Sequence, residues 1–206
     1  MKNYISINNQ KIELTDEQVK QITEAYGKGN ITLSEVPVGE LVKVGDFEFV
    51  VLEQFGKETA LILKGLYGAD TEFAENNNNY DGSYVDDRCR DFAAELAERI
   101  GADNIILHTV DLTSDDGLKD YGTVERRASL ITAEMYRKYV EILDKFKPKN
   151  WWWLATPFST KRHDNDIWGK CVSPSGFIYD FRCNNIGSGV RPFCIFASSI
   201  FESYEE

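Results

Sequence analysis

The chain has 206 residues, of which 42% are hydrophobic and 13% aromatic, so it is long enough to bury one substantial core. Its net charge of −11 argues against a nucleic-acid partner and against an anionic membrane surface, because binding to either relies on clustered lysine and arginine. Residues 1–30 lack the basic stretch and apolar run of a signal peptide, and no apolar run reaches the roughly 18 residues of a membrane span. We therefore expect cytoplasmic synthesis without a signal peptide, and no membrane insertion.

Residues 1–30 predict a small module of two strands, a helix and a linker. The strands are expected at 4–7 and 11–14, around an asparagine-rich turn. Thr15 and Gln18 form a capping-box pattern that starts the helix. The apolar face of this helix consists of Val19, Ile22 and Tyr26.

This module is too small to hold a core by itself. The sequence thus divides into residues 1–30 and a main domain at 31–206. Through residues 1–27 the module is expected to pack on the main domain, on a copy of itself as a homo-oligomer, or on a larger assembly.

In the main domain, segments 42–52 and 59–63 have the β-branched and apolar density of two strands joined at 55–57. The asparagine-rich segment 76–82 is typical of a turn-prone polar loop. A surface loop without function is the favoured interpretation, and part of a binding surface is the alternative.

Two helices follow from apolar residues at helical spacing, at 84–100 and 135–146. Their apolar stripes predict core packing rather than cofactor binding. The expected buried residues are Cys89, Phe92, Ala93, Leu96 and Ile100 in the first helix, and Tyr136, Tyr139, Val140 and Leu143 in the second.

Few residues suit catalysis. His108 stands beside an apolar run and is expected to be structural, whereas His163 lies in a polar segment and is expected to be an exposed contact residue. No metalloprotease, hydrolase or phosphate-binding motif is present, so we expect no catalytic residue and no cofactor.

Acidic and cysteine residues likewise predict no metal site. The acidic stretch does not match a calcium loop and is expected to be solvated; it contains Asp111, Asp115, Asp116, Asp120 and Glu125. The four cysteines show no zinc-ligand spacing and are expected to be reduced thiols, with a Cys171–Cys183 bridge as the alternative.

Three adjacent tryptophans, Trp151, Trp152 and Trp153, predict a strand that anchors the core. Side chains alternate along a strand, so Trp151 and Trp153 share one face and Trp152 takes the other. Both faces must then be covered, because each indole has a large apolar surface.

The tryptophan strand is followed by a long exposed polar loop at 158–166, without strand or helix periodicity. Segment 169–181 then predicts a hairpin around a Pro-Ser-Gly turn. The side chain of Arg191, between Val190 and Pro192, is expected to be buried, with its fork-shaped guanidinium group paired. It is expected to link the last strand to the tryptophan strand.

These segments resemble a bacterial and phage domain family of undefined function. Its signature has a Trp-Trp-Leu-Arg-Ser/Thr-Pro strand, a Val-x-x-x-Gly hairpin and a closing Gly-Val-Arg-Pro-Ala strand. The corresponding residues here are 152–157, 172–176 and 189–193, and the resemblance extends upstream to an opening hairpin at 38–52 and a helix at 130–136. Ala155 and Phe193 depart from the family's Arg and Ala, which implies different local core packing.

The resemblance implies an α+β fold of the C-type-lectin-like kind, with a small twisted antiparallel sheet, two main helices and long displayed loops. Some proteins with such a scaffold are targets of diversity-generating retroelements or are phage receptor-binding proteins. The sugar-binding calcium motifs of true C-type lectins are absent from the chain.

We therefore predict a non-enzymatic protein that binds a protein or glycan ligand, with a phage virion as one expected location. The alternatives are an enzyme on a scaffold like that of formylglycine-generating enzymes and a structural subunit of a phage tail. The predicted ligand-binding residues are Ser159, Thr160, Lys161, Arg162, His163, Asp164, Asn165, Asp166, Tyr179, Phe181, Arg182, Asn184 and Asn185.

Overall fold

The computed structural model describes residues 3–7, 10–15, 17–18 and 32–200. Strands β1 (Asn3–Ile7) and β2 (Gln10–Leu14) form an antiparallel hairpin in which Asn3 pairs with Leu14. The Thr15 amide donates to Gln18 Oε1 at 2.9 Å, and the Gln18 amide donates to Thr15 Oγ1 at 3.2 Å. These contacts confirm the two strands and the capping box, whereas the predicted helix body and linker lie outside the described residues.

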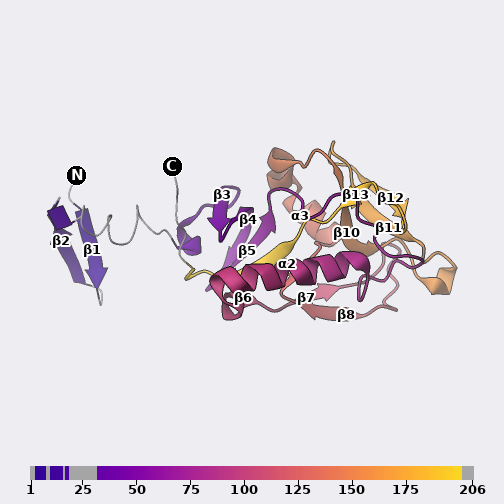
Figure 1. Ribbon diagram of the computed structural model, residues 1–206, viewed down its shortest axis with the longest axis horizontal. Coiled ribbons are helices and arrows are strands. Elements are labelled where there is room, and N and C mark those ends of the chain that lie inside the picture. Colours follow the sequence, from indigo (N-terminus) through magenta and orange to yellow (C-terminus); the bar gives the residue numbers. More distant parts are fainter. Residues whose placement is uncertain (1–2, 8–9, 16, 19–31, 201–206) are drawn as a thin grey trace.

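The main body is α+β, with mostly antiparallel sheets and two α-helices within the described residues (Figure 1). The larger sheet has the order β3-β4-β5-β14-β6, and β9 also pairs with β14. Its strands are β3 (Leu41–Val44), β4 (Phe47–Phe55), β5 (Glu58–Leu63), β6 (Ile105–Ile106), β9 (Ala128–Ser129) and β14 (Phe193–Ala197). The C-terminal strand β14 thus lies between β5 and β6 and joins distant parts of the chain.

The smaller sheet has the order β12-β11-β10-β13 and holds the tryptophan strand. Its strands are β10 (Trp151–Pro157), β11 (Trp168–Val172), β12 (Ile178–Arg182) and β13 (Ser188–Gly189). A separate hairpin pairs β7 (His108–Asp111) with β8 (Thr123–Arg126). Gly189 lies where β13 approaches the segment after β5, and a Cβ there would come within 2.8 Å of the Gly68 carbonyl, so only glycine fits.

Helices α2 (Tyr84–Ile100) and α3 (Ala133–Leu143) cover different core faces, and α2 runs along the long axis of the molecule (Figure 1). Four short 3₁₀ helices complete the body: η1 (Leu33–Glu35), η2 (Ala102–Asn104), η3 (Asp144–Phe146) and η4 (Lys161–His163). Helix α2 has its predicted bounds. Helix α3 begins two residues earlier than predicted, after the Thr132 cap, and its predicted end is the 3₁₀ turn η3.

The core consists of two buried clusters that meet at the tryptophan strand. Trp153 and half-buried Trp151 belong to the cluster with Phe92 of α2, whereas Trp152 belongs to the cluster with Tyr136 of α3. The Trp153 indole donates to the Thr71 carbonyl at 2.7 Å. The predicted alternation of the three tryptophans is confirmed, and β10 therefore contributes side chains to both clusters.

The expectation of a single strand at 42–52 was wrong. Gly45 adopts a φ of 60°, and the chain turns there between β3 and β4. The opening hairpin expected from the family resemblance is present at the same place. Gly45 and Asp46 are both exposed and interrupt the apolar pattern at this turn, and core residues lie on either side of them.

Arg191 is buried, with 1% of its surface exposed. Its Nε donates to the Leu63 carbonyl at 2.8 Å, and its Nη2 donates to the carbonyls of Lys64 (3.3 Å) and Phe146 (3.0 Å). The guanidinium also lies 5.1 Å from the centre of the Trp152 ring. The predicted buried guanidinium fork is present, but it binds carbonyls at the end of β5, in the segment after β5 and in η3. It reaches the tryptophan strand only through the Trp152 ring.

Within the described ranges, no helix combines the length and apolarity that crossing a membrane requires.

Candidate functional site

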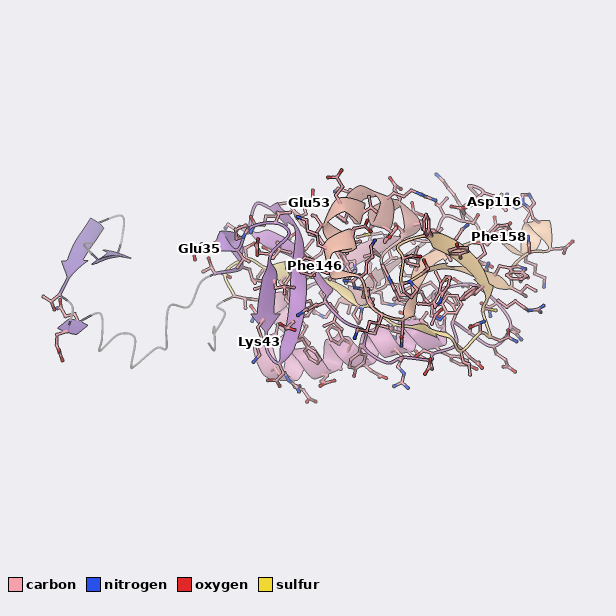
Figure 2. All side chains as sticks on the ribbon, turned by 90° about the horizontal axis from the view of Figure 1, so that it is seen from above. Glu35, Lys43, Glu53, Asp116, Phe146 and Phe158 are labelled. Atoms are coloured by element: carbon pink, nitrogen blue, oxygen red, sulfur yellow. The ribbon has the colours of Figure 1, made fainter. Side chains whose placement is uncertain are left out.

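The candidate surface is the connection between β10 and β11, residues 158–167, together with the neighbouring edge strand β12. This connection lies at the end of the molecule furthest from β3 (Figure 1). Figure 2 shows Phe158 and Asp116 together at that end. The expectation of a wholly exposed loop was wrong: Ser159 and Thr160 are 2% and 1% exposed, Lys161 to Asp164 are exposed, and Asn165 and Asp166 are half-buried.

Asn78 fastens both ends of this connection. Its side-chain amide donates to the Ser159 carbonyl at 2.9 Å and to the Trp168 carbonyl at 2.8 Å, and its oxygen accepts from the Tyr121 hydroxyl at 2.9 Å. Asn78 is fully buried. The favoured interpretation of 76–82 as a plain surface loop was therefore wrong at this position, since Asn78 holds the candidate surface in place.

Two carboxylates hold the middle of the connection. Asp116 accepts from the Ser159 hydroxyl at 2.6 Å, and its Oδ2 lies 2.9 Å from His163 Nδ1. Asp120 accepts from the Thr160 hydroxyl at 2.7 Å and pairs with the Arg162 guanidinium. Hydrogen bonds from Ser114 and Ser159, together with His163, lower the pKa of Asp116 well below its usual range.

The predicted exposure of the acidic stretch is confirmed, since Asp111, Asp115, Asp116, Asp120 and Glu125 are all exposed. Their carboxylates nevertheless accept hydrogen bonds or form ion pairs with neighbouring side chains. Asp111 accepts from Thr113, and Glu125 accepts from Thr109. Asp115 lies 2.8 Å from the Lys170 ammonium. Burial disfavours the charge on Lys170, but the carboxylates of Asp115 and Asp180 outweigh this and raise its pKa.

Ser159, His163 and Asp116 are not arranged as a catalytic triad. In a triad, serine and carboxylate bind opposite nitrogens of the imidazole. Here the Ser159 hydroxyl and the Asp116 carboxylate both face Nδ1, at 3.5 and 2.9 Å. The Ser159 hydroxyl donates a hydrogen bond to the Asp116 carboxylate and not to the imidazole. These three side chains therefore order the β10–β11 connection.

The predicted residues of β12 lie on two faces. Tyr179 and Phe181 pack against Trp151, with ring centres 5.2 and 4.7 Å apart, and Tyr179 is 49% exposed. Arg182 is exposed on the other face, with its guanidinium 5.8 Å from the centre of the Trp168 ring.

Only some of the predicted ligand-binding residues in and after β12 lie near the β10–β11 connection. The Cys183 amide donates to the Ile167 carbonyl at 2.9 Å, which places Arg182 and exposed Asn184 and Asn185 beside the end of the connection. Tyr179 lies three residues before Arg182 on β12, about 10 Å from it along the strand. Two exposed apolar residues were missed, Phe177 before β12 and Ile186 after it.

The four cysteines are free and buried, so the alternative Cys171–Cys183 bridge is not formed. Burial raises the pKa of Cys89 and of Cys171 to about 12. A thiol with such a pKa stays protonated at neutral pH and is a poor nucleophile. Among residues 32–200 and the described N-terminal segments, no group of three histidine, cysteine or acidic side chains is placed to hold a metal ion.

His108 is half-buried, with Nε2 2.8 Å from Ser129 Oγ and its ring edge-on to Phe193 at 5.1 Å. This supports the structural role predicted for it, although its Nδ1 has no hydrogen-bond partner among the described residues. Burial lowers the pKa of His108 to about 4.

This buried imidazole predicts a loss of stability in mild acid. The unfolded histidine titrates near pH 6.5, so between about pH 6.5 and 4 the unfolded state binds the extra proton. The stabilisation is complete above this window and is lost as the pH falls through it, on the order of 2–3 kcal/mol. Urea unfolding across this range should show a shallower decline for His108→Gln than for wild type, and parallel curves would contradict the assignment.

Comparisons of the chain with models of protein families, with curated proteins and with solved structures found no match.

Proposed function

We propose that this protein is a non-enzymatic binding protein that presents residues 161–164 and the exposed edge of β12 to a protein or glycan ligand. This proposal is supported above all by the β10–β11 connection, which has a buried, hydrogen-bonded part followed by an exposed part. Ser159 and Thr160 are buried and fastened by Asn78, Asp116 and Asp120, whereas the next four residues are exposed. Such a connection loses little conformational entropy on binding, because its backbone is already ordered.

The chemistry of the exposed residues supports recognition rather than catalysis. Lys161, Arg162, His163 and Asp164 provide charged and hydrogen-bonding groups, and exposed Tyr179 adds an aromatic anchor backed by Trp151. Asp164 adopts a left-handed φ of 50°, a conformation that aspartate tolerates better than most residues and that turns the chain sharply after η4.

The scaffold is proposed to be C-type-lectin-like. The α+β architecture, the closing strand β14 and the buried Arg191 in the Gly-Val-Arg-Pro segment support this proposal. Membership of the bacterial and phage family, diversification by a retroelement and a location on a phage virion are further parts of the same proposal. They rest on the sequence resemblance.

The binding proposal predicts a selective loss of affinity. In glycan-array and whole-cell binding assays, the triple variant Lys161→Ala, Arg162→Ala, Tyr179→Ala should bind at least about tenfold more weakly than wild type, because it lacks two charges and the aromatic anchor. A control triple variant, Lys43→Ala, Lys57→Ala, Leu107→Ala, changes exposed residues away from the β10–β11 connection and should keep its affinity. Equal binding by both variants, with unchanged melting temperatures, would refute the proposed surface.

A further inference from the structure

A second concave surface lies away from the β10–β11 connection. It is a groove of about 610 Å³ between three parts of the chain: the β3–β4 turn with the start of β4, the end of β5 with the segment that follows it, and η3 with the segment that follows it. Figure 2 shows Phe146, which lines this groove, well apart from Asp116 and Phe158 along the long axis of the molecule. The groove is therefore separate from the surface proposed above.

The groove has an apolar lining and a lysine-rich rim. The apolar lining includes Phe47, Leu63, Leu66, Tyr67, Phe146 and Pro148. The rim carries Lys64, Lys145, Lys147 and Lys149, together with the acidic residues Asp46 and Glu48. Four lysines around one groove contrast with the overall charge of −11.

The acidic residues of the rim are already paired. Asp46 accepts from the Arg99 guanidinium at 2.7 Å, and Glu48 lies 3.0 Å from the Lys64 ammonium. Lys147 lies 3.1 Å from Asp144. Within residues 32–200, Lys145 and Lys149 form no ion pair, so the rim carries an excess of positive charge.

A buried cation lies behind the lining. Arg191 donates to the carbonyls of Lys64 and Phe146, both of which are groove residues. Within the described part of the chain Arg191 has no carboxylate partner, and a buried charge without a counterion is screened weakly. Burial lowers the pKa of Arg191 to about 10, which leaves it cationic at neutral pH.

We propose that this groove binds an acidic peptide segment of a protein partner, with carboxylates at the lysine rim and apolar side chains on the aromatic lining. Lys147 and Lys149 are exposed on either side of half-buried Pro148. Residues two apart in an extended chain are about 6.6 Å apart and face the same side. An extended peptide with alternating acidic and apolar residues can therefore place its carboxylates at the lysine rim and its apolar side chains on the apolar lining. A sulfated saccharide matches the charge but has no apolar groups for Phe47, Leu66 and Phe146.

Fluorescence anisotropy with the full chain tests this proposal. The probe is a labelled hexapeptide of alternating aspartate and phenylalanine, and the comparison probes are a lysine–phenylalanine hexapeptide and a heparin tetrasaccharide. The double variant Lys145→Glu, Lys149→Glu should weaken binding of the acidic peptide at least about tenfold, and raised salt should weaken binding to wild type.

The control variant Lys57→Glu, Lys119→Glu changes the net charge by the same amount at two exposed sites outside the groove, and should change affinity less than about twofold. Equal effects of the two double variants would overturn the proposal, since only the total charge would then matter. Tighter binding of the lysine–phenylalanine peptide or of the tetrasaccharide would also overturn it. These outcomes are independent of the surface at 161–164, whose variants should bind the acidic peptide as wild type does.

Discussion

Replacement of Arg191 by alanine is expected to lower the free energy of unfolding by about 3–5 kcal/mol. The substitution removes three hydrogen bonds to the carbonyls of Leu63, Lys64 and Phe146 and leaves a cavity beside Trp152. Buried carbonyls without donors are costly, and water reaches this position poorly because Arg191 is almost completely enclosed.

Urea unfolding measures this effect, with Arg162→Ala as the matched control. Arg162 is exposed and pairs with Asp120 at the surface, so its loss should cost less than about 1 kcal/mol. Arg191→Lys keeps the charge but not the planar fork, and should be intermediate in stability. Equal unfolding midpoints for wild type and Arg191→Ala would contradict the structural role of this residue.

Replacement of Asn78 by alanine is expected to cost about 3 kcal/mol and to loosen the β10–β11 connection. The fully buried amide joins the carbonyls of Ser159 and Trp168 and accepts from Tyr121, so all three partners lose a hydrogen bond together. Asn78→Asp should cost more, because it places carboxylate oxygens against two carbonyl oxygens.

Hydrogen exchange separates this local effect from general destabilisation. Amides of residues 158–167 should exchange faster in Asn78→Ala than in wild type, whereas those of α2 should be affected less. Asn76→Ala, an exposed neighbour in the same segment, should leave both regions unchanged. Unaltered exchange at 158–167 in Asn78→Ala would show that the connection is ordered by other contacts.

Periodic segments of this chain were predictable from the sequence. The apolar stripe with Phe92 and Leu96 predicted α2, and alternation along a strand placed Trp152 opposite Trp151 and Trp153. In these cases the side chains that face the core recur at a fixed spacing. The pattern can therefore be read without knowledge of the partners.

The contacts that order the candidate surface were not predictable in the same way. Asn78 stands in a run of four asparagines, and only its partners at Tyr121, Ser159 and Trp168, 43 to 90 residues away, distinguish it from its neighbours. Asp116 and Asp120 were noticed, but a carboxylate that accepts from a distant hydroxyl has the same local sequence as a solvated one. Long-range polar pairing has no periodicity, so the anchor of the surface emerged only from the structure.

Sequencing of the gene from many isolates tests most directly whether residues 161–164 and the edge of β12 form a displayed binding surface. We expect substitutions concentrated at the exposed positions Lys161, Arg162, His163, Asp164 and Tyr179. The residues that hold them, Asn78, Asp116, Asp120, Ser159 and Thr160, should be unchanged. Uniform conservation of the exposed positions, or substitutions spread equally over the exposed and the buried residues, would contradict it.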